Sequence, residues 1–421
     1  MNNSQTSVVA LMAFCFAFAG SIPAQSPPLP VIPTNTFRVT EYGAVGDGQT
    51  MNTTAIQKTI DAASKAGGGI VLIPEGRFLT GPFMLASRIN LHLAKGAMIL
   101  IGDDMTKYPV AKARYQDCIS VADAQDIEIS GEGTIDGQGK AWWAAFEADH
   151  SMTHRPYMIK LSNCQRVRVQ GVTLSNSPMF HLVPQNCTDV TIQGITIKSP
   201  SNAHNTDGID PSGWNYLITD CTIDAGDDNI AVKPGSGRIP GDKNYTIMNC
   251  KFLHGHGMSI GSGTSGGIED LRVSNCSFDE TDSGIRIKTA RMRGGLLQNL
   301  TYENLTMTAV KNPIYIIDWY PERDAPKDPA TEKAEPITDR TPINKNIIIR
   351  NVTATDCPTA GTIRGLPEAP VSDVTLSNVT ISAKAGMKIY HAKGIRFIDS
   401  KIEVETGKRL TLFDAEVSGL E

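Results

Sequence analysis

The sequence predicts an all-β solenoid in which short parallel strands wind into about ten stacked coils. From about residue 120 the chain repeats one unit. Each unit has an Asx or Gly corner, a short strand of alternating apolar and polar residues, a second Asx or Gly corner and a second short apolar stretch. Most equivalent corners are 23 to 29 residues apart, and alternation places every second side chain of a strand on the inner face. Such a period is typical of parallel β-coils. The second corner of successive units falls at Gly171, Gly194, Asp220, Asn249, Asn275, Asn304, Asn351 and Asn378.

Asn and Asp suit these corners because they tolerate left-handed backbone and their side chains can bond to neighbouring backbone groups. In stacked coils the corner residues would form a ladder. Three cysteines, Cys221, Cys250 and Cys276, directly follow corners, at places where other units have Val, Ile or Leu. We therefore expect buried thiols stacked inside the coil rather than disulfide partners.

Residues 53–66 differ from the repeat and predict an amphipathic helix. Their apolar side chains Ile56, Ile60 and Ala63 recur at helical spacing, and the segment stops at three successive glycines, residues 67–69. A solenoid has an open edge with unpaired strand groups. We expect this N-terminal α-helix to cap that edge at the first coil.

The amino-terminal segment predicts export. Residues 8–20 are an apolar run too short to span a bilayer, and small residues follow up to a cleavage site after Ala24. We interpret residues 1–24 as a signal peptide, 25–36 as an extended lead-in and 37–421 as a single β-helix domain, so the mature protein would be secreted or periplasmic. A membrane anchor is the alternative, because residues 1–7 contain no Lys or Arg.

Composition limits the partners. The chain of 421 residues has 39 basic and 44 acidic residues, a formal net charge of −5, whereas general nucleic-acid binders are basic. We expect no nucleic-acid partner, no membrane span in the mature chain and a monomer. Any anionic ligand needs a local cluster of cations. A long interruption of the repeat, residues 321–345 with five prolines, is either a wall of a binding cleft or an idle surface loop.

Four short clusters stand out from the repeat. Each alone is common in proteins, but successive clusters lie 21, 28 and 30 residues apart, each about one coil. In a parallel coil, residues one coil apart become neighbours on adjacent strands, roughly 4.8 Å apart. We therefore predict that carboxylates, an imidazole and two cations share one wall of the coil. The clusters are Asn205-Thr206-Asp207-Gly208-Ile209-Asp210, Gly226-Asp227-Asp228, Gly255-His256-Gly257 and Arg286-Ile287-Lys288.

Two details depend on local geometry. Arg286 and Lys288 are two residues apart, so on a strand their side chains face the same side. Asp227 and Asp228 are adjacent and would face opposite sides of a strand, so we expect a bulge or turn at Gly226. Clustered carboxylates repel one another, and at least one should have a raised pKa and hold a proton near neutral pH.

These residue types predict acid–base hydrolysis of an acidic polysaccharide. Glycoside hydrolysis needs one protonated carboxyl group for the leaving oxygen and one ionised carboxylate as base or nucleophile. Neighbouring cations suit a substrate with its own carboxylate, which Arg can bind through two hydrogen bonds. An elongated coil also offers a long groove for a polymer. This chemistry calls for no cofactor and no metal.

The four clusters, in this order on a coiled repeat, resemble those of the polygalacturonase family, glycoside hydrolase family 28, in the pectin-lyase-like superfamily. The stretch from Glu41 to Gly48, with the helix and glycines after it, is similar to the opening segment of the same superfamily. The resemblance covers roughly residues 37–400. It implies a right-handed parallel β-helix and inverting hydrolysis of α-1,4-galacturonosyl linkages in polygalacturonate or pectin.

The resemblance also implies roles for the acids. Asp227 matches the general acid, and Asp207 and Asp228 match the pair that activates the attacking water. His256 matches the histidine that supports protonation of the acid. An inverting mechanism needs acid and base roughly 6.5–9.5 Å apart to admit the water.

The substrate-binding residues are expected beside these acids. Arg286 and Lys288 match the family's binders of the substrate carboxylate, and Asn205 opens the first cluster. The family also has a tyrosine one coil further on. Tyr315, 27 residues after Lys288, is the candidate, with packing in the core as its alternative.

Three other functions remain open. A rhamnogalacturonan or xylogalacturonan hydrolase of the same family would apply the same acids to other pectins. A pectate lyase would share the coil and the polymer but would use calcium, which the Asp cluster could bind; His256 and the two cations oppose that ion. A non-catalytic β-helix would bind the polymer without needing the acids.

Overall fold

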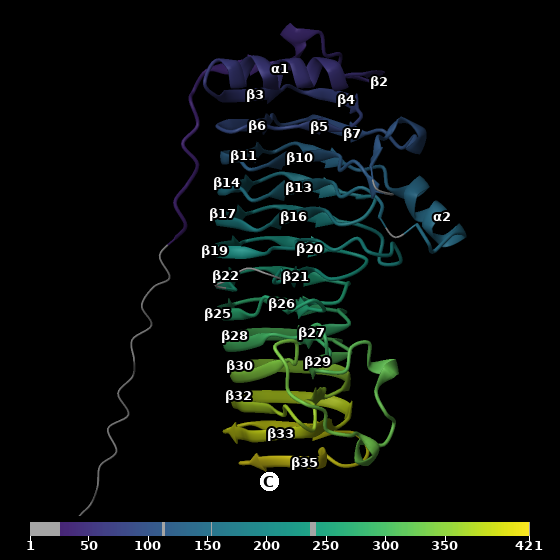
Figure 1. Cartoon of the computed structure of the whole chain (residues 1–421), viewed down its shortest axis with the longest axis vertical. Helices are drawn as coiled ribbons and strands as arrows, with labels where there is room; N and C mark the ends of the chain where they lie inside the picture. Colours follow the sequence, from purple (N-terminus) through teal and green to yellow (C-terminus); the bar gives the residue numbers. More distant parts are fainter. Residues whose placement is uncertain (1–25, 112–113, 153, 236–240, 421) are drawn as a thin grey trace, which may run out of the picture.

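The chain winds into a right-handed parallel β-helix whose coils stack along one axis (Figure 1). The structure, a computed structural model, describes residues 26–111, 114–152, 154–235 and 241–420. The predicted signal peptide, residues 1–24, lies outside the described residues. The fold class predicted from the repeat is confirmed.

Each coil contributes strands to three parallel ladders. The first ladder begins with β1 (Thr36–Arg38), β3 (Gly69–Ile73), β6 (Ile89–Leu93), β11 (Gln125–Gly131), β14 (Gln165–Gln170), β17 (Cys187–Gln193), β19 (Gly213–Thr219), β22 (Asp242–Met248) and β25 (Ile268–Ser274). The second begins with β2 (Asp47–Met51), β4 (Gly76–Thr80), β7 (Ala97–Ile101), β12 (Thr134–Asp136), β15 (Thr173–Ser175), β18 (Thr196–Lys198), β20 (Thr222–Asp224), β23 (Lys251–Leu253) and β26 (Ser277–Asp279).

Later coils join these two ladders through long strands. One strand, β28, pairs with both β25 and β26, so it continues from the first ladder into the second. The joining strands are β28 (Leu296–Thr308), β30 (Ile343–Thr359) and β32 (Val371–Ala385), and β34 (Lys401–Val404) follows in the second ladder.

The third ladder, called the site ladder below, carries the candidate site. An isolated pairing through Ile209 joins its two halves. Its strands are β5 (Phe83–Met84), β10 (Ile119–Ala122), β13 (Ile159–Ser162), β16 (Leu182–Gln185), β21 (Ile230–Val232), β24 (Met258–Gly261), β27 (Ser283–Lys288), β29 (Asn312–Ile317), β31 (Thr362–Arg364), β33 (Met387–Ile398) and β35 (Leu410–Ser418).

The corners between ladders are built as the repeat predicts. Asn275, Asn304 and Asn351 have φ of 54°, 54° and 53°, in the left-handed region that Asn tolerates. Their amides stack from coil to coil: Asn304 Nδ2 donates to Asn275 Oδ1 at 3.0 Å, and Asn351 Nδ2 donates to Asn304 Oδ1 at 2.9 Å. The predicted ladder of corner residues is confirmed.

The interior is filled by stacked apolar side chains. Ile, Val and Leu dominate, and the rings of Tyr216 and Tyr245 stack with centroids 4.7 Å apart. Cys221, Cys250 and Cys276 are buried free thiols within this stack. They pack in the coil without pairing as disulfides, as predicted.

Helix α1 (Thr53–Lys65) lies across the first coil at one end of the stack (Figure 1). Ile56, Ile60 and Ala63 are fully buried there, and the helix contacts β1, β3 and β5. Gly67 and Gly68, with φ of 90° and 115°, then turn the chain into β3. The predicted capping helix is confirmed.

Three segments within the described ranges leave the stack. A segment between β7 and β10 contains β8 (Val110–Ala111) and β9 (Arg114–Tyr115), and a second, between β12 and β13, contains the projecting α2 (Lys140–Ala148). A third segment connects β29 to β30 (Figure 1). The described residues also form four short 3₁₀ helices: η1 (Val39–Tyr42), η2 (Met105–Lys107), η3 (Glu322–Asp324) and η4 (Pro329–Thr331). No helix in the described ranges has the length and apolar character needed to cross a membrane.

Candidate active site

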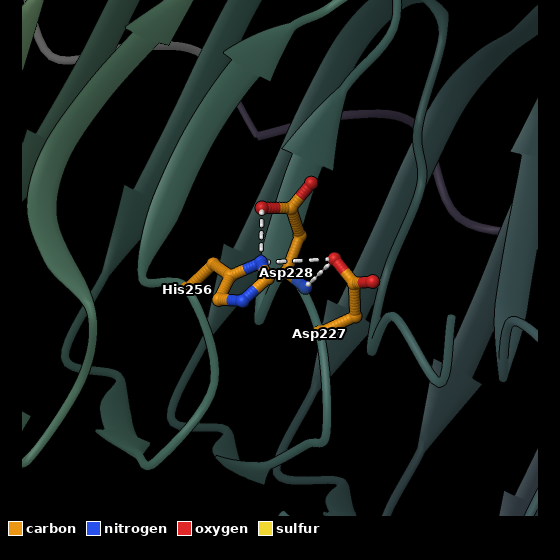
Figure 2. A group of neighbouring side chains, drawn as sticks. All are labelled: Asp227, Asp228 and His256. Carbon is orange, nitrogen blue, oxygen red and sulfur yellow. Dashed lines mark hydrogen bonds and ion pairs between the residues drawn. The ribbon is translucent and has the colours of Figure 1, made fainter. Parts of the chain in front are cut away.

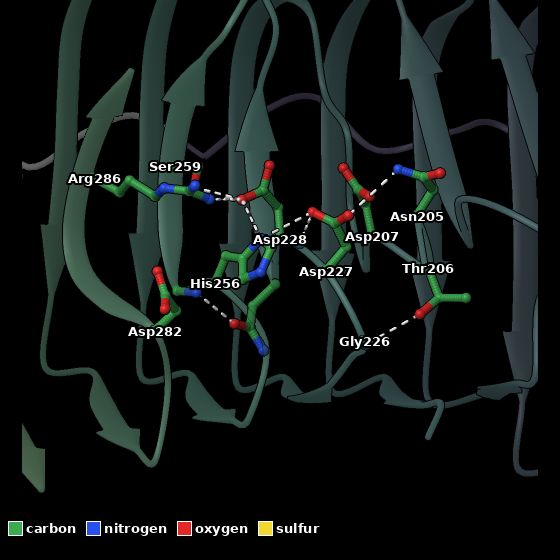
Figure 3. Close-up of polar contacts among 12 residues, drawn as sticks. Asn205, Thr206, Asp207, Gly226, Asp227, Asp228, His256, Ser259, Asp282 and Arg286 are labelled. Atoms are coloured by element: carbon green, nitrogen blue, oxygen red, sulfur yellow. Dashed lines mark hydrogen bonds and ion pairs between the residues drawn. The ribbon is translucent and has the colours of Figure 1, made fainter. Parts of the chain in front are cut away.

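The four sequence clusters assemble on the outward face of the site ladder. Ile230, Met258 and Ile285 pair in register on adjacent strands and are fully buried. Because side chains alternate along a strand, the next residues, Ser259 and Arg286, point outward. Figure 3 shows these outward side chains beside those of the Asp and His clusters. The convergence predicted from one-coil spacing is therefore confirmed.

A bend at Gly226 brings two consecutive aspartates to the same side. The segment bends at Gly226 and Asp227, after β20 has ended. A Cβ at Gly226 would lie 2.4 Å from the carbonyl oxygen of Ala203, so only glycine fits this approach. The backbone N–H of Asp228 donates to Asp227 Oδ1 at 2.9 Å, and both carboxylates lie near His256 (Figure 2). The predicted turn at Gly226 is confirmed.

Asp227 is paired with His256. His256 Nδ1 lies 3.0 Å from Asp227 Oδ1, and Asn205 Nδ2 donates to Asp227 Oδ2 at 3.4 Å. Burial raises the pKa of Asp227, but the hydrogen bond from His256 and nearby cations outweigh burial, and the pKa is lowered. In the ligand-free protein Asp227 is therefore ionised, whereas a general acid must hold a proton.

Asp228 lies among cations. Lys288 Nζ donates to its Oδ2 at 2.6 Å, whereas Arg286 Nη1 and Ser259 Oγ each donate to its Oδ1 at 2.8 Å. Burial raises the pKa of Asp228, but Lys288 and Arg286 outweigh it and hold the pKa well below its usual range. Asp228 is thus a fixed anion, and both predicted substrate binders are paired with it in the free protein.

Asp207 is the carboxylate with a strongly raised pKa. It is buried, and Lys233 Nζ lies 2.8 Å from its Oδ2 while also pairing with Asp210. Burial and the neighbouring Asp210 raise the pKa of Asp207 well above its usual range although Lys233 opposes them, and burial raises the pKa of Asp210 to about 6. One ammonium group thus lies between two buried carboxylates. The raised pKa expected for one of the clustered carboxylates belongs to Asp207, whereas the pKa of Asp227 is lowered.

The two remaining candidate substrate-binding residues, Asn205 and Tyr315, lie at opposite sides of the acids. Asn205 contacts Asp227, as described above. Tyr315 is the register neighbour of Arg286 on the next strand, and its hydroxyl donates to Glu322 Oε2 at 2.7 Å. Tyr315 is half-buried on the outward face, so the core-packing alternative for this residue is wrong.

Sequence reasoning missed Tyr320 and Lys233. The Tyr320 ring centroid is 5.3 Å from Lys288 Nζ and 5.9 Å from the Arg286 guanidinium carbon, so the start of the insertion after β29 borders the site. Alternation could have found Lys233, because it lies two residues after the outward Ala231. Tyr320 had no such signal, because it lies outside the repeat.

Arg155 was also missed, and it links helix α2 to the acids. It is fully buried, and its Nη2 donates to Asn205 Oδ1 at 2.9 Å. Its guanidinium carbon lies 4.3 Å from the ring centroid of Phe146, a residue of α2. Arg155 therefore fixes the amide that contacts Asp227.

A divalent cation does not fit this site. Asp227, Asp228 and His256 each have a potential ligand atom, and these atoms lie within 4.8 Å of one another (Figure 2). However, Lys288 and Arg286 already donate to both oxygens of Asp228 and would repel a metal. Ca²⁺ also prefers six to eight oxygen ligands. The donor set therefore disfavours the calcium chemistry of a lyase.

Acids, an imidazole and carboxylate-binding cations on a parallel β-helix define the class of glycoside hydrolases acting on an acidic sugar. The family model described as glycosyl hydrolases family 28 matches residues 68–401. The chain belongs to this family.

Individual relatives are consistent with this membership. A probable polygalacturonase of Vitis vinifera is 35% identical over 375 residues, covering 83% of this chain and 74% of the relative. An endo-polygalacturonase of Pectobacterium carotovorum subsp. carotovorum is 30% identical and covers 78% of this chain and 87% of the relative. The crystal structure of a hyperthermoactive exopolygalacturonase from Thermotoga maritima superposes with a TM-score of 0.78 at 26% identity, over 90% of this chain and 94% of the other.

Proposed function

We propose that this protein hydrolyses α-1,4-galacturonosyl linkages in polygalacturonate or pectin by inverting general acid–base catalysis. The observation that carries the proposal is the contact between the acids and two cations: Arg286 and Lys288 lie directly beside Asp228, which neighbours the Asp227–His256 pair. A substrate with a carboxylate on each sugar would meet these cations next to the bond that is cut.

Substrate binding can supply the proton that the free Asp227 lacks. A substrate carboxylate at Arg286 and Lys288 adds negative charge beside Asp227. This charge raises the pKa of Asp227, so a proton passes from His256 Nδ1 to Asp227 Oδ1 across their 3.0 Å contact. The acid is then protonated only when an anionic substrate is present.

The chemical step uses Asp227 as the acid and Asp228 as the base. Asp227 gives its proton to the glycosidic oxygen as the bond from that oxygen to the anomeric carbon breaks. Asp228, held ionised by its cations, accepts a proton from the water that attacks the anomeric carbon, and Asp207 orients this water. After product release Asp228 loses its proton to solvent, and the Asp227–His256 pair regains one.

One spacing departs from the expected geometry. An oxygen of Asp227 and an oxygen of Asp228 lie within 4.8 Å of each other, closer than the roughly 6.5–9.5 Å between the acid and base of an inverting pair. The cause is their consecutive position at the bend. Stereochemistry of the product is therefore an informative test of this proposal.

Replacement of the proposed acid tests the function. Asp227→Asn should lower the rate of reducing-end release from polygalacturonate by about 10²-fold to 10⁴-fold, because Asn cannot donate the proton. Binding of the polymer should persist. The matched control is Asp279→Asn, an exposed aspartate on β26, which should keep full activity. Unchanged hydrolysis by Asp227→Asn would contradict the proposal.

The two cations favour homogalacturonan over rhamnogalacturonan, because every unit of homogalacturonan carries a carboxylate. Comparison of initial rates on the two polymers tests this preference, and faster cleavage of rhamnogalacturonan would overturn it.

We also infer export of the mature chain. This inference is supported by the apolar run and small residues within 1–24. Amino-terminal sequencing of protein recovered outside the cytoplasm should begin at Gln25, and a retained apolar segment would contradict it.

A further inference from the structure

A second group of cations lies on the site ladder, on the α1 side of the acids. Lys160 is on β13, and the neighbouring Ile159 and Leu161 are fully buried, so Lys160 points outward. Its Nζ lies 4.9 Å from the ring centroid of Tyr157, and the guanidinium carbon of Arg114 lies 4.5 Å from the same ring. Tyr157 in turn stacks on Phe180 with centroids 4.9 Å apart, which fixes the ring that both cations share.

This arrangement matches the one at the other side of the acids. There, Arg286 and Lys288 lie 5.9 and 5.3 Å from the ring centroid of Tyr320. In both places one arginine and one lysine flank a tyrosine ring. Pairing runs from β13 through β16, Ile209, β21 and β24 to β27, five steps of about 4.8 Å. The two cation groups are therefore about 24 Å apart on one face.

Lys160 lacks an ion-pair partner. Arg114 pairs with Asp117 at 3.5 Å, whereas no carboxylate in the described part of the chain pairs with Lys160. Burial lowers the pKa of Lys160, Asp117 and Asp210 oppose this shift without forming an ion pair with the ammonium group, and Arg114 adds to it. A substrate carboxylate in direct contact would supply the ion pair that Lys160 lacks.

We propose that Lys160 and Arg114, on the Tyr157 ring, form a second carboxylate-binding subsite for a galacturonate unit remote from the cut bond. The inference rests on the proposed function for the identity of the ligand. A polymer that lies along the helix axis would contact Arg286 and Lys288 at one end of the acids and this subsite at the other. The subsite would thus contribute to binding of long chains and not of short ones.

Binding measurements test this subsite without relying on cleavage. The parent is the Asp227→Asn chain, titrated by calorimetry with a galacturonate dimer and a galacturonate hexamer. Adding Lys160→Gln should raise the Kd for the hexamer by about 10-fold to 100-fold, the effect of losing one hydrogen bond to a charged group. The dimer should bind as before. Lys160→Arg should restore hexamer binding, and Lys251→Gln, an exposed lysine on β23, is the matched control.

A second ligand identifies the charge as the recognised group. For a fully methyl-esterified hexamer, the parent and Lys160→Gln chains should bind alike. Equal hexamer binding by both chains, an equal loss for dimer and hexamer, or no hexamer binding by the parent would each overturn the subsite. Wild-type hydrolysis is measured separately: a chain that binds hexamer through Lys160 but does not cleave polygalacturonate would refute the proposed function and leave the subsite standing.

Discussion

At the scale of single residues, the acids differ in charge state because their surroundings differ. Asp228 is held ionised by Lys288 and Arg286, whereas burial beside Asp210 raises the pKa of Asp207. At Asp227 burial raises the pKa, but the hydrogen bond with His256 outweighs it and the pKa is lowered. In the proposed mechanism the site therefore contains an ionised base in the free protein and gains its protonated acid when an anion binds.

Replacing Arg286 should move the acid side of the pH profile. The proposed base, Asp228, must be ionised to act, so activity should be lost as pH falls through its pKa. Arg286→Gln removes one of the cations that lower this pKa, so the pKa rises and the acid limb of kcat/KM shifts to higher pH. We also expect kcat/KM to fall by about 10-fold to 100-fold from the lost charged hydrogen bond.

The control for this profile is Arg396→Gln, an exposed arginine on β33. It should keep the parent profile. An acid limb that stays in place or moves to lower pH in Arg286→Gln would contradict the assignment of Asp228 as the base.

The sequence could predict which residues meet but not which atoms pair. One-coil spacing placed the acids, His256 and the cations on one wall, and this depends only on the period of the backbone. The contacts of Asp228 with three donors depend on side-chain rotamers, which spacing does not determine. For the same reason spacing could not predict that the raised pKa belongs to Asp207 and not to Asp227.

At the scale of elements, the asparagine corners join neighbouring coils. Asn304 donates to Asn275 and accepts from Asn351, and its φ of 54° is costly for residues other than Asn, Asp and Gly. The corner amides therefore help to fix the stacking of coils on which the site depends.

Substitution of Asn304 separates the contribution of the amide hydrogen bonds from that of the left-handed backbone. Asn304→Ala should lower the free energy of unfolding by about 1–3 kcal/mol, because it combines left-handed strain with two lost hydrogen bonds. Asn304→Gly should cost less, because glycine adopts positive φ without strain. Urea unfolding measures both, and a Gly variant less stable than the Ala variant would contradict this explanation.

The insertion after β29 is fastened to the C-terminal coils by a buried glutamate. Glu332 is fully buried, accepts a hydrogen bond from Arg364 Nε at 3.0 Å, and lies 3.3 Å from His391 Nε2. Because the same insertion begins beside Tyr320, this anchor holds the segment that borders the cations. The insertion lay outside the repeat, so sequence spacing could not place it.

Glu332→Gln should loosen this insertion. Breaking a buried ion pair leaves Arg364 without its counter-charge and should destabilise the anchored segment by about 3 kcal/mol. Limited proteolysis with mass spectrometry should then show faster cleavage within residues 321–345. Glu335→Gln, an exposed ion pair in the same insertion, should keep the parent pattern. Equal cleavage rates in both variants would contradict the anchor.

At the scale of the whole molecule, the coil-length sequence repeat and the N-terminal capping helix explain the fold. The recurring corners fixed the coil length, and the periodicity of residues 53–66 was enough to predict α1. Helix α2 and the insertion after β29 follow no period, so their positions came only from the structure. Both parts border the site: α2 does so through Arg155, and the insertion, which the sequence predicts only as a long loop, does so through Tyr320.

Disrupting the cap should expose the first coil. Ile60→Asp places a charge at a fully buried position of α1 and should detach the helix from β1 and β3. The uncovered strand edge should then promote self-association, visible by light scattering after size-exclusion chromatography. Lys58→Asp, at an exposed position of the same helix, should elute as the parent does. Parent-like elution of Ile60→Asp would contradict the capping role.

Time-resolved NMR of polygalacturonate during cleavage by the wild-type chain tests the central claim most directly. If one face of the coil holds an acid, a base and cations for inverting hydrolysis, the new reducing ends should appear first as the β-anomer, with no unsaturated product. Initial release of the α-anomer, or the appearance of unsaturated ends, would contradict the account.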